Sequence, residues 1–231
     1  MTIGVTDSGI GGLNVLAKMI KRRCGDEYLY LADGANLPYG DKRAEDLKEI
    51  ALENARTLEK LGAKVIVFGC NTLSVTALEY VRQNVKAPVF GLRPRPELLS
   101  GKALLMTTPT TALYLSKIEP NVSLLTPEKL ASLIDADYPN TTRVKAYLSP
   151  LLLPYEGVES VCLGCSHYLY AKEVIASLIP NAVITDGTEA LADLIRAVLP
   201  REGSKHPTVA FRFTGKSENE RYARILTDLI E

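Results

Sequence analysis

Short apolar runs alternate with longer helical patterns along almost the whole chain, and this alternation constrains the fold more than any other feature of the sequence. Val65–Phe68 and Ala103–Thr107 are almost continuously apolar, which is typical of strands buried on both faces under helices. Residues 44–61 place their apolar side chains at helical spacing, and Gly62 ends that pattern because glycine readily adopts the conformation that follows a helix. The βαβα order predicts an α/β protein with mostly parallel sheets and flanking helices.

The expected elements divide into two similar α/β domains. Arg93–Pro96 interrupts any regular element, and glycine, serine and two prolines cluster in Pro200–Pro207. We therefore expect a first domain of residues 1–92 plus 208–231 and a second domain of residues 93–207. The expected strands are Ile3–Thr6, Tyr28–Ala32, Val65–Phe68, Val89–Gly91, Ala103–Thr107, Val122–Leu124, Ser160–Leu163, Ala182–Thr185 and Val209–Phe213, and the clearest helices are Leu13–Arg22, Ala44–Leu61 and Glu218–Ile230.

Composition and charge exclude several classes of protein. The 231 residues carry 27 Lys+Arg against 27 Asp+Glu, so the chain lacks the basic excess that is typical of nucleic-acid-binding proteins. The longest apolar runs fall far short of the roughly 20 residues that a membrane-spanning helix needs. Met1 leads directly into an apolar run without a basic segment, so we expect no signal peptide, and the four scattered cysteines are expected to be free thiols. These features predict a cytoplasmic globular protein that binds neither nucleic acid nor membranes.

The two halves of the chain share a short motif. Val65–Thr72 resembles Ser160–His167, because each is an apolar strand followed by Gly-Cys, two polar residues and a helical pattern. The polar residues therefore lie at the carboxyl ends of strands, where open α/β sheets bind their ligands. Two such halves would form a cleft with Cys70 on one wall and Cys165 on the other.

Two facing thiols could act as the acid and the base of one proton-transfer reaction. A thiol becomes reactive where a helix N-terminus or a suitable partner lowers its pKa, and both cysteines precede a predicted helix. His167 could exchange a proton with Cys165, and Asp7 could hold or relay a proton near Cys70. Two thiols on opposite sides of one carbon can remove a proton from one face and deliver one to the other, which inverts a stereocentre. Side chains that could hold a carboxylate or an ammonium group stand beside them: Ser8, Asn71, Thr72 and Ser166.

Other uses of these residues compete with this interpretation. A cysteine at the end of a buried strand is usually a small core residue, but the repeated Gly-Cys motif favours function at both sites. Cys162 alternates with apolar neighbours and is expected in the core, whereas Cys24 lies in a polar stretch and is expected on the surface. Cys162 and Cys165 form a C-x-x-C pair near a histidine, yet no second pair has zinc-ligand spacing, so no metal is expected. The Gly9–Gly12 turn does not match phosphate-binding loops and is expected to pass close to a substrate.

Four motifs follow one another along the chain: Asp7–Leu13, Pro38–Gly40, Cys70–Thr72 and Gly164–Tyr168. In this combination and order they resemble the glutamate racemases of the aspartate/glutamate racemase superfamily, and the resemblance covers nearly the whole chain. It implies a cofactor-independent isomerase that interconverts L- and D-glutamate for peptidoglycan synthesis. The implied fold is two α/β domains with the active site in the cleft between them and the last segment packed on the first domain.

The resemblance also implies roles for individual residues. Cys70 and Cys165 match the family's two catalytic cysteines, with Asp7 and His167 as their helpers; Cys70 would serve the D-substrate and Cys165 the L-substrate. Neither a cofactor nor a metal is implied, the partner is the small molecule glutamate, and the resemblance leaves a homodimer open. Substrate-contacting positions of the family match Asp7, Ser8, Tyr39, Gly40, Asn71, Thr72, Thr108, Thr111, Ser166 and His167.

The chain departs from the family pattern at several places without altering either thiol. Ser166 stands where the family usually has threonine, and Arg93–Pro96 replaces an acidic segment. Gly187 follows Asp186 where the family has serine, and a family glutamate falls near Asp135. Two alternatives therefore stay open: an aspartate racemase, and a paralogue that binds an acidic amino acid without turning it over.

Overall fold

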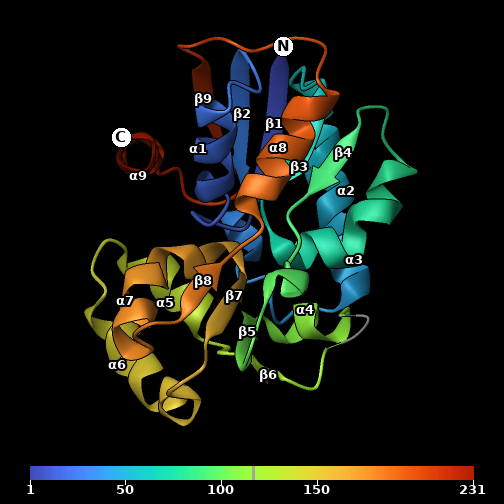
Figure 1. Ribbon diagram of the computed structural model, residues 1–231. Coiled ribbons are helices and arrows are strands. Elements are labelled where there is room, and N and C mark those ends of the chain that lie inside the picture. Colours follow the sequence, from blue (N-terminus) through green and yellow to red (C-terminus); the bar gives the residue numbers. More distant parts are fainter. Residues whose placement is uncertain (116–117) are drawn as a thin grey trace.

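Two parallel β-sheets with flanking helices form the computed structural model, which describes residues 1–115 and 118–231 (Figure 1). The first sheet has the strand order β4-β3-β1-β2-β9 and the second has the order β6-β5-β7-β8, and every strand pair in both is parallel. The expected α/β fold class is therefore confirmed. The first sheet consists of β1 (Thr2–Asp7), β2 (Glu27–Ala32), β3 (Val65–Phe68), β4 (Val89–Gly91) and β9 (Thr208–Phe213), and the second of β5 (Ala103–Thr107), β6 (Val122–Leu125), β7 (Ser160–Gly164) and β8 (Val183–Thr185).

Helices connect successive strands, as a parallel sheet requires. No helix within the described ranges is both long enough and apolar enough to cross a membrane. The α-helices are α1 (Leu13–Lys21), α2 (Ala44–Lys60), α3 (Asn71–Arg82), α4 (Pro109–Leu113), α5 (Leu130–Asp137), α6 (Thr142–Leu152), α7 (Lys172–Leu178), α8 (Thr188–Val198) and α9 (Asn219–Ile230), and the short 3₁₀ helices are η1 (Gly34–Asn36), η2 (Pro96–Leu98), η3 (Leu153–Tyr155) and η4 (Ser166–Ala171).

The first sheet is buried on both faces, which explains its continuously apolar strands. Val5 of β1 pairs with Val67 of β3, and both belong to the core cluster that includes α1, α8 and α9. Ile66 and Phe68 belong to a second core cluster with residues of α2 and α3. Because successive side chains of a strand point to opposite faces, one apolar run supplies both cores.

The C-terminal segment returns to the first sheet. Strand β9 pairs with β2 at the edge of that sheet, as the red strand beside the blue ones shows (Figure 1). Helix α9 is anchored by Tyr222, whose ring contacts Tyr30, Phe211 and Phe213 with centroid separations of 5.0–6.0 Å. The last segment therefore completes the packing of the first half.

Helix α8 lies against α1 although it belongs to the expected second domain. Lys18 Nζ lies 2.5 Å from Glu189 Oε1, and Arg22 Nε lies 2.7 Å from Asp193 Oδ1. These exposed ion pairs contribute little stability, but they show which face of α8 meets the first half. The division into residues 1–92 plus 208–231 and residues 93–207 stays a prediction.

One expectation about the cysteines is wrong. Cys162 is fully buried, as predicted, but so is Cys24, which the polar neighbourhood placed on the surface. Arg23 adopts a positive φ of 54° after α1, and the chain turns so that the Cys24 thiol points inward. Its Sγ lies 3.7 Å from the Ala192 carbonyl of α8, and burial raises the pKa of Cys24 to about 11. Cys24 is therefore a core residue, held as an uncharged thiol.

Candidate active site

A buried pocket lies between loops that follow strands of both sheets. Its enclosed space is about 20 Å³, room for one or two water molecules, so entry of an organic substrate requires the walls to part. Eight of the residues predicted for the site line it: Ser8, Tyr39, Gly40, Cys70, Thr72, Thr108, Cys165 and His167. The other four, Asp7, Asn71, Thr111 and Ser166, are buried without lining the pocket.

Cys70 follows β3 and precedes the first residue of α3. Burial raises the pKa of Cys70 well above its ordinary value, and nearby Asp7 and Cys165 raise it further. The N–H groups of Leu73 and Thr72 lower this pKa, as a helix N-terminus should, but burial outweighs them. Burial therefore favours the protonated thiol at Cys70, against the anion that the helix N-terminus was expected to favour.

Asn71 stands next to Cys70 with both amide atoms buried and without a hydrogen-bond partner among the described residues. A buried amide that lacks its hydrogen bonds is unfavourable by about 1–3 kcal/mol per group, so each such group calls for a partner, which a bound ligand or water can supply. This observation supports the predicted role of Asn71 in binding.

Cys165 follows β7, but the helix after it differs from the prediction. Residues Ser166–Ala171 form the 3₁₀ helix η4, and α7 begins only at Lys172. Cys165 therefore does not stand at the N-terminus of an α-helix as predicted, and His167 is the ionisable side chain that contacts it. Burial lowers the pKa of His167, but hydrogen bonds to Asp135 and Cys165 and the charge of Asp7 raise it well above its ordinary value.

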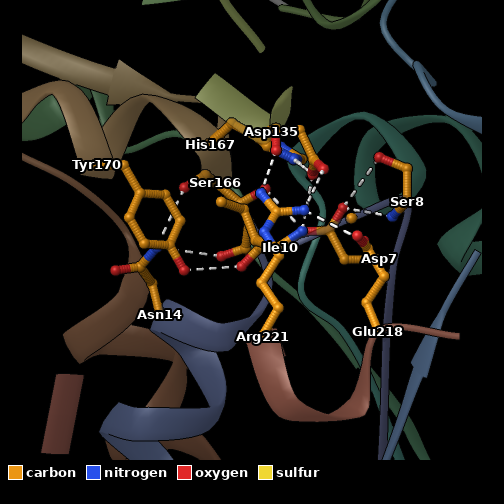
Figure 2. A network of polar contacts seen from close by, with 12 residues as sticks. Asp7, Ser8, Ile10, Asn14, Asp135, Ser166, His167, Tyr170, Glu218 and Arg221 are labelled. Carbon is orange, nitrogen blue, oxygen red and sulfur yellow. Dashed lines mark hydrogen bonds and ion pairs between the residues drawn. The ribbon is translucent and has the colours of Figure 1, made fainter. Parts of the chain in front are cut away.

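Asp135 of α5 is the partner that holds His167. Its Oδ2 lies 2.9 Å from His167 Nε2 and accepts a 2.9 Å hydrogen bond from the Ile10 N–H (Figure 2). Burial raises the pKa of Asp135, but His167, the Ile10 N–H and Arg221 together bring it below its ordinary value. The pair is therefore an imidazolium and a carboxylate. The sequence placed a family glutamate near Asp135 but did not reveal this contact.

Asp7 ends β1 behind the pocket wall. Its Oδ1 accepts a 2.6 Å hydrogen bond from the Ser8 N–H, and its Oδ2 accepts one of 2.8 Å from Ser166 Oγ. Burial raises the pKa of Asp7, and His167 and these donors only partly offset that effect. Asp7 is thus suited to hold a proton near Cys70.

The glycines after Asp7 are required by a close approach between the two halves. A Cβ atom on Gly9 would lie 1.8 Å from Asp135 Oδ2, and one on Gly11 would lie 2.6 Å from His167 Nδ1. The turn was expected to pass close to a substrate, whereas the groups it meets are the side chains that serve Cys165. Only glycine allows this contact without displacing the His167–Asp135 pair.

Three threonine hydroxyls form a closed cluster at the pocket, which Thr72 and Thr108 line. Thr72 Oγ1 lies 3.0 Å from Thr108 Oγ1 and 3.1 Å from Thr111 Oγ1, and the last two lie 2.9 Å apart. Thr110 donates a 2.7 Å hydrogen bond to the Gly40 carbonyl, which joins α4 to the Tyr39–Gly40 loop. The cluster brings the predicted Thr108 and Thr111 together with Thr72 from the first half.

A buried carboxylate that the sequence analysis missed fixes Tyr39. The Tyr39 hydroxyl donates a 2.6 Å hydrogen bond to Asp33 Oδ2, and Asn54 Nδ2 lies 3.1 Å from that hydroxyl. Asp33 follows β2 directly, at the same edge of the sheet as Asp7. Its position at a strand's carboxyl end was the signal that could have identified it.

Two acidic residues also line the pocket, Asp41 from the first half and Glu128 from the second. Burial raises the pKa of Asp41, and the charge of Glu128 adds to that effect. Among the described lining residues none is lysine or arginine, so His167 is the only cationic group at the wall. No three His, Cys, Asp or Glu side chains of residues 1–115 and 118–231 converge as metal ligands, and the absence of a metal stays a prediction.

Comparison with known proteins identifies the family. No family model matches the chain. A glutamate racemase of Leptospira interrogans is 30% identical to it over an alignment that covers 100% of this chain and 97% of that protein. The chain belongs to the glutamate racemase family.

Solved structures of family members share the fold over the full length. The glutamate racemase of Campylobacter jejuni superposes with a TM-score of 0.84 at 20% identity and covers 100% of this chain and 98% of that one. The glutamate racemase of Thermus thermophilus in complex with beta-chloro-D-alanine gives a TM-score of 0.80 at 27% identity, covering 99% and 92%. Both sheets and the returning C-terminal segment are therefore part of the shared architecture.

Proposed function

We propose that the protein is a glutamate racemase that inverts the α-carbon without a cofactor, with Cys70 and Cys165 as its acid/base pair, and that it supplies D-glutamate for peptidoglycan. The observation that carries the proposal is that both thiols line one buried pocket and come from different sheets. Membership of the glutamate racemase family supports glutamate as the substrate.

The reaction needs one proton transfer at each face of the substrate. With the L-substrate, the Cys165 thiolate takes the α-proton, so the Cα–H bond breaks and an S–H bond forms. The Cys70 thiol delivers its proton to the opposite face, which completes the D-product and leaves Cys70 as the thiolate. The reverse reaction exchanges these roles. The imidazolium of His167 stabilises a thiolate at Cys165, and Asp7 offers a proton-holding group between the two halves.

Neutral donors supply most of the groups that could hold the substrate. The unpartnered amide of Asn71 and the Thr72–Thr108–Thr111 cluster suit carboxylate oxygens, which accept hydrogen bonds from amide N–H and hydroxyl groups. The small closed space excludes bulk water, and in a water-poor site such donors stabilise developing negative charge more strongly. The pocket thereby favours the carbanion-like state that proton removal creates.

The test is proton exchange during inversion. In D₂O the wild-type protein should convert L-glutamate to D-glutamate with deuterium at Cα, as followed by NMR and chiral analysis. Cys70→Ser and Cys165→Ala should abolish inversion, whereas Cys24→Ala and Cys162→Ala, which remove buried thiols elsewhere, should retain it. Substantial racemisation by Cys165→Ala would contradict the mechanism.

The same assay separates the alternatives. Faster inversion of L-aspartate than of L-glutamate would indicate an aspartate racemase. A rise in melting temperature with glutamate, without any D-product at high protein concentration, would indicate a binding protein. A homodimer and a cytoplasmic location stay predictions, and sedimentation analysis with and without glutamate tests the first.

A further inference from the structure

Arg221 of α9 reaches the His167–Asp135 pair from the C-terminal segment. Its Nη2 donates to the Asp135 backbone carbonyl, and its Nη1 lies 3.7 Å from Asp135 Oδ1 (Figure 2). Glu218 Oε2 accepts a 3.1 Å hydrogen bond from the same Nη1. The Arg221 guanidinium therefore lies between the carboxylate of Glu218 and the more buried carboxylate of Asp135. The Arg221 side chain is 25% exposed and that of Asp135 is 10% exposed.

Two groups of the first half thus hold a carboxylate of the second. The Ile10 N–H binds Asp135 Oδ2 and Arg221 faces Oδ1, while His167 Nε2 shares Oδ2 with Ile10. A carboxylate held on both oxygens has little freedom to rotate. Because Asp135 occupies Nε2, Nδ1 is the ring nitrogen of His167 left for other partners, and Cys165 is the other side chain whose hydrogen bonding raises the pKa of His167.

We propose that Arg221 is a positioning residue for racemisation: it fixes the Asp135 carboxylate and, through it, orients His167 toward Cys165. The proposal rests on the proposed function, because it assigns Arg221 to the Cys165 side of that reaction. It also means that the residues that orient His167 toward Cys165 are all in place only when α9 and α5 are in contact. Proton transfer at Cys70 does not involve Arg221, Asp135 or His167.

A merely structural role for Arg221 is less consistent with the contacts. Helix α9 is anchored by the neighbouring Tyr222, which is 3% exposed and contacts three aromatic rings. Ile225 and Leu226 are buried on the same helix. The attachment of α9 to the first half therefore does not depend on Arg221, whose described partners are Asp135 and Glu218.

The charged and titratable groups around His167 determine how a substitution at Arg221 changes the pKa of His167. Asp7 of β1, Asp135 of α5 and Cys165 at the end of β7 all raise the pKa of His167, while burial lowers it. Arg221 acts on Asp135, whose pKa it lowers. Loss of the positive charge alone would raise the pKa of His167, whereas loss of the position of Asp135 would weaken its contact with His167 and lower that pKa. The proposal therefore predicts a lower pKa for the imidazole when Arg221 is removed.

The kinetic test compares variants on one helix. Arg221→Met should lower kcat by about 10- to 100-fold, the range for losing a charge-assisted contact, with a much smaller change in KM. Arg221→Lys keeps the charge and should recover part of that loss. Arg224→Met is the matched control, because Arg224 is exposed on α9, and it should leave kcat unchanged.

A double-mutant cycle tests whether Arg221 acts through Asp135. If it does, adding Arg221→Met to Asp135→Asn should produce little further loss of kcat, because the coupled residues are not additive. Fully multiplicative losses, or an Arg221→Met protein with wild-type kcat, would overturn the proposal.

An NMR titration provides a readout that does not need activity. The chain has two histidines, and the exposed His206 serves as an internal reference. Arg221→Met and Arg221→Lys should keep the His206 signals in place, whereas the His167 titration should move to lower pH, more for methionine than for lysine. A His167 titration that is unchanged in folded Arg221→Met, or that moves to higher pH as loss of the charge alone would produce, would overturn the proposal. Absence of racemisation by the wild type would instead refute the proposed function, and the titration would still decide the role of Arg221.

Discussion

Replacing Gly9 by alanine should damage the Cys165 side of the site from the other half of the molecule. The added Cβ would lie 1.8 Å from Asp135 Oδ2, 2.8 Å from Asp135 Cγ and 3.1 Å from His167 Nε2. An aspartate is too short to move aside while keeping its partners. The carboxylate would therefore lose its contact with the Ile10 N–H, with His167, or with both.

The magnitude follows from those hydrogen bonds. Each involves a charged group and contributes roughly 1.5–3 kcal/mol, so the loss of one destabilises the fold by about 2 kcal/mol. In a protein of this size roughly 2–4 °C of Tm is lost per kcal/mol, so Tm should fall by about 4–8 °C. If the transition state also loses about 2 kcal/mol of stabilisation, kcat should fall roughly 30-fold.

The assay measures Tm, urea denaturation and glutamate racemisation for Gly9→Ala beside Gly34→Ala. A Cβ on Gly34 meets nothing within 4 Å, so this control should change stability by less than about 0.5 kcal/mol and leave kcat as in the wild type. Wild-type stability and activity in Gly9→Ala would refute the reasoning, because they would show that the two halves do not approach closely at this turn.

Three further predictions follow from buried charges. The pKa of Asp7 is raised in the folded state, so its contribution to stability is present below about 3.8 and is lost as the pH rises through the folded-state pKa. Asp7→Asn should lose activity, yet its Tm relative to wild type should rise as the pH is raised above about 3.8. The raised pKa of His167 stabilises the fold at pH values below about 6.5, and this stabilisation is lost as the pH rises through the folded-state pKa. The lowered pKa of Asp135 stabilises the fold at pH values above about 3.8. The unfolding free energy of His167→Gln, measured by urea denaturation at several pH values, should therefore differ most from that of the wild type between pH 3.8 and 6.5. Tyr39→Phe removes the donor to buried Asp33 and should destabilise the protein by about 1.5–3 kcal/mol in the same measurement, while a change under 0.5 kcal/mol would contradict the proposed contact.

Local patterns in the sequence were enough to predict the strands that lead into the pocket. Val65–Phe68 and Ala103–Thr107 are apolar because helices cover both faces, and the structure places both as strands with the predicted bounds. Both thiols line one pocket because Cys70 and Cys165 follow parallel strands at their carboxyl ends. Such positions depend on neighbours along the chain, which is why the sequence reveals them.

The polar network was not predictable in the same way. Asp135 meets His167 across 32 residues of sequence, Ile10 across 125 and Arg221 across 86. None of these separations leaves a periodic signal, since each depends on how α5 and α9 lie in three dimensions. Cys24 was misplaced for a related reason, because its polar neighbours describe the surface of a turn while the turn itself directs the thiol inward.

The return of β9 to the first sheet also affects how the chain can fold while it is being synthesised. Strand β2 ends at Ala32, but its outer neighbour ends at Phe213, 181 residues later. At roughly 5–20 residues per second, β2 has an unpaired edge for about 10–40 s before its partner emerges from the ribosome. An unpaired strand edge can pair with another chain, so truncation before Thr208 should make the nascent protein prone to aggregation even though both thiols and the whole pocket have been synthesised by then.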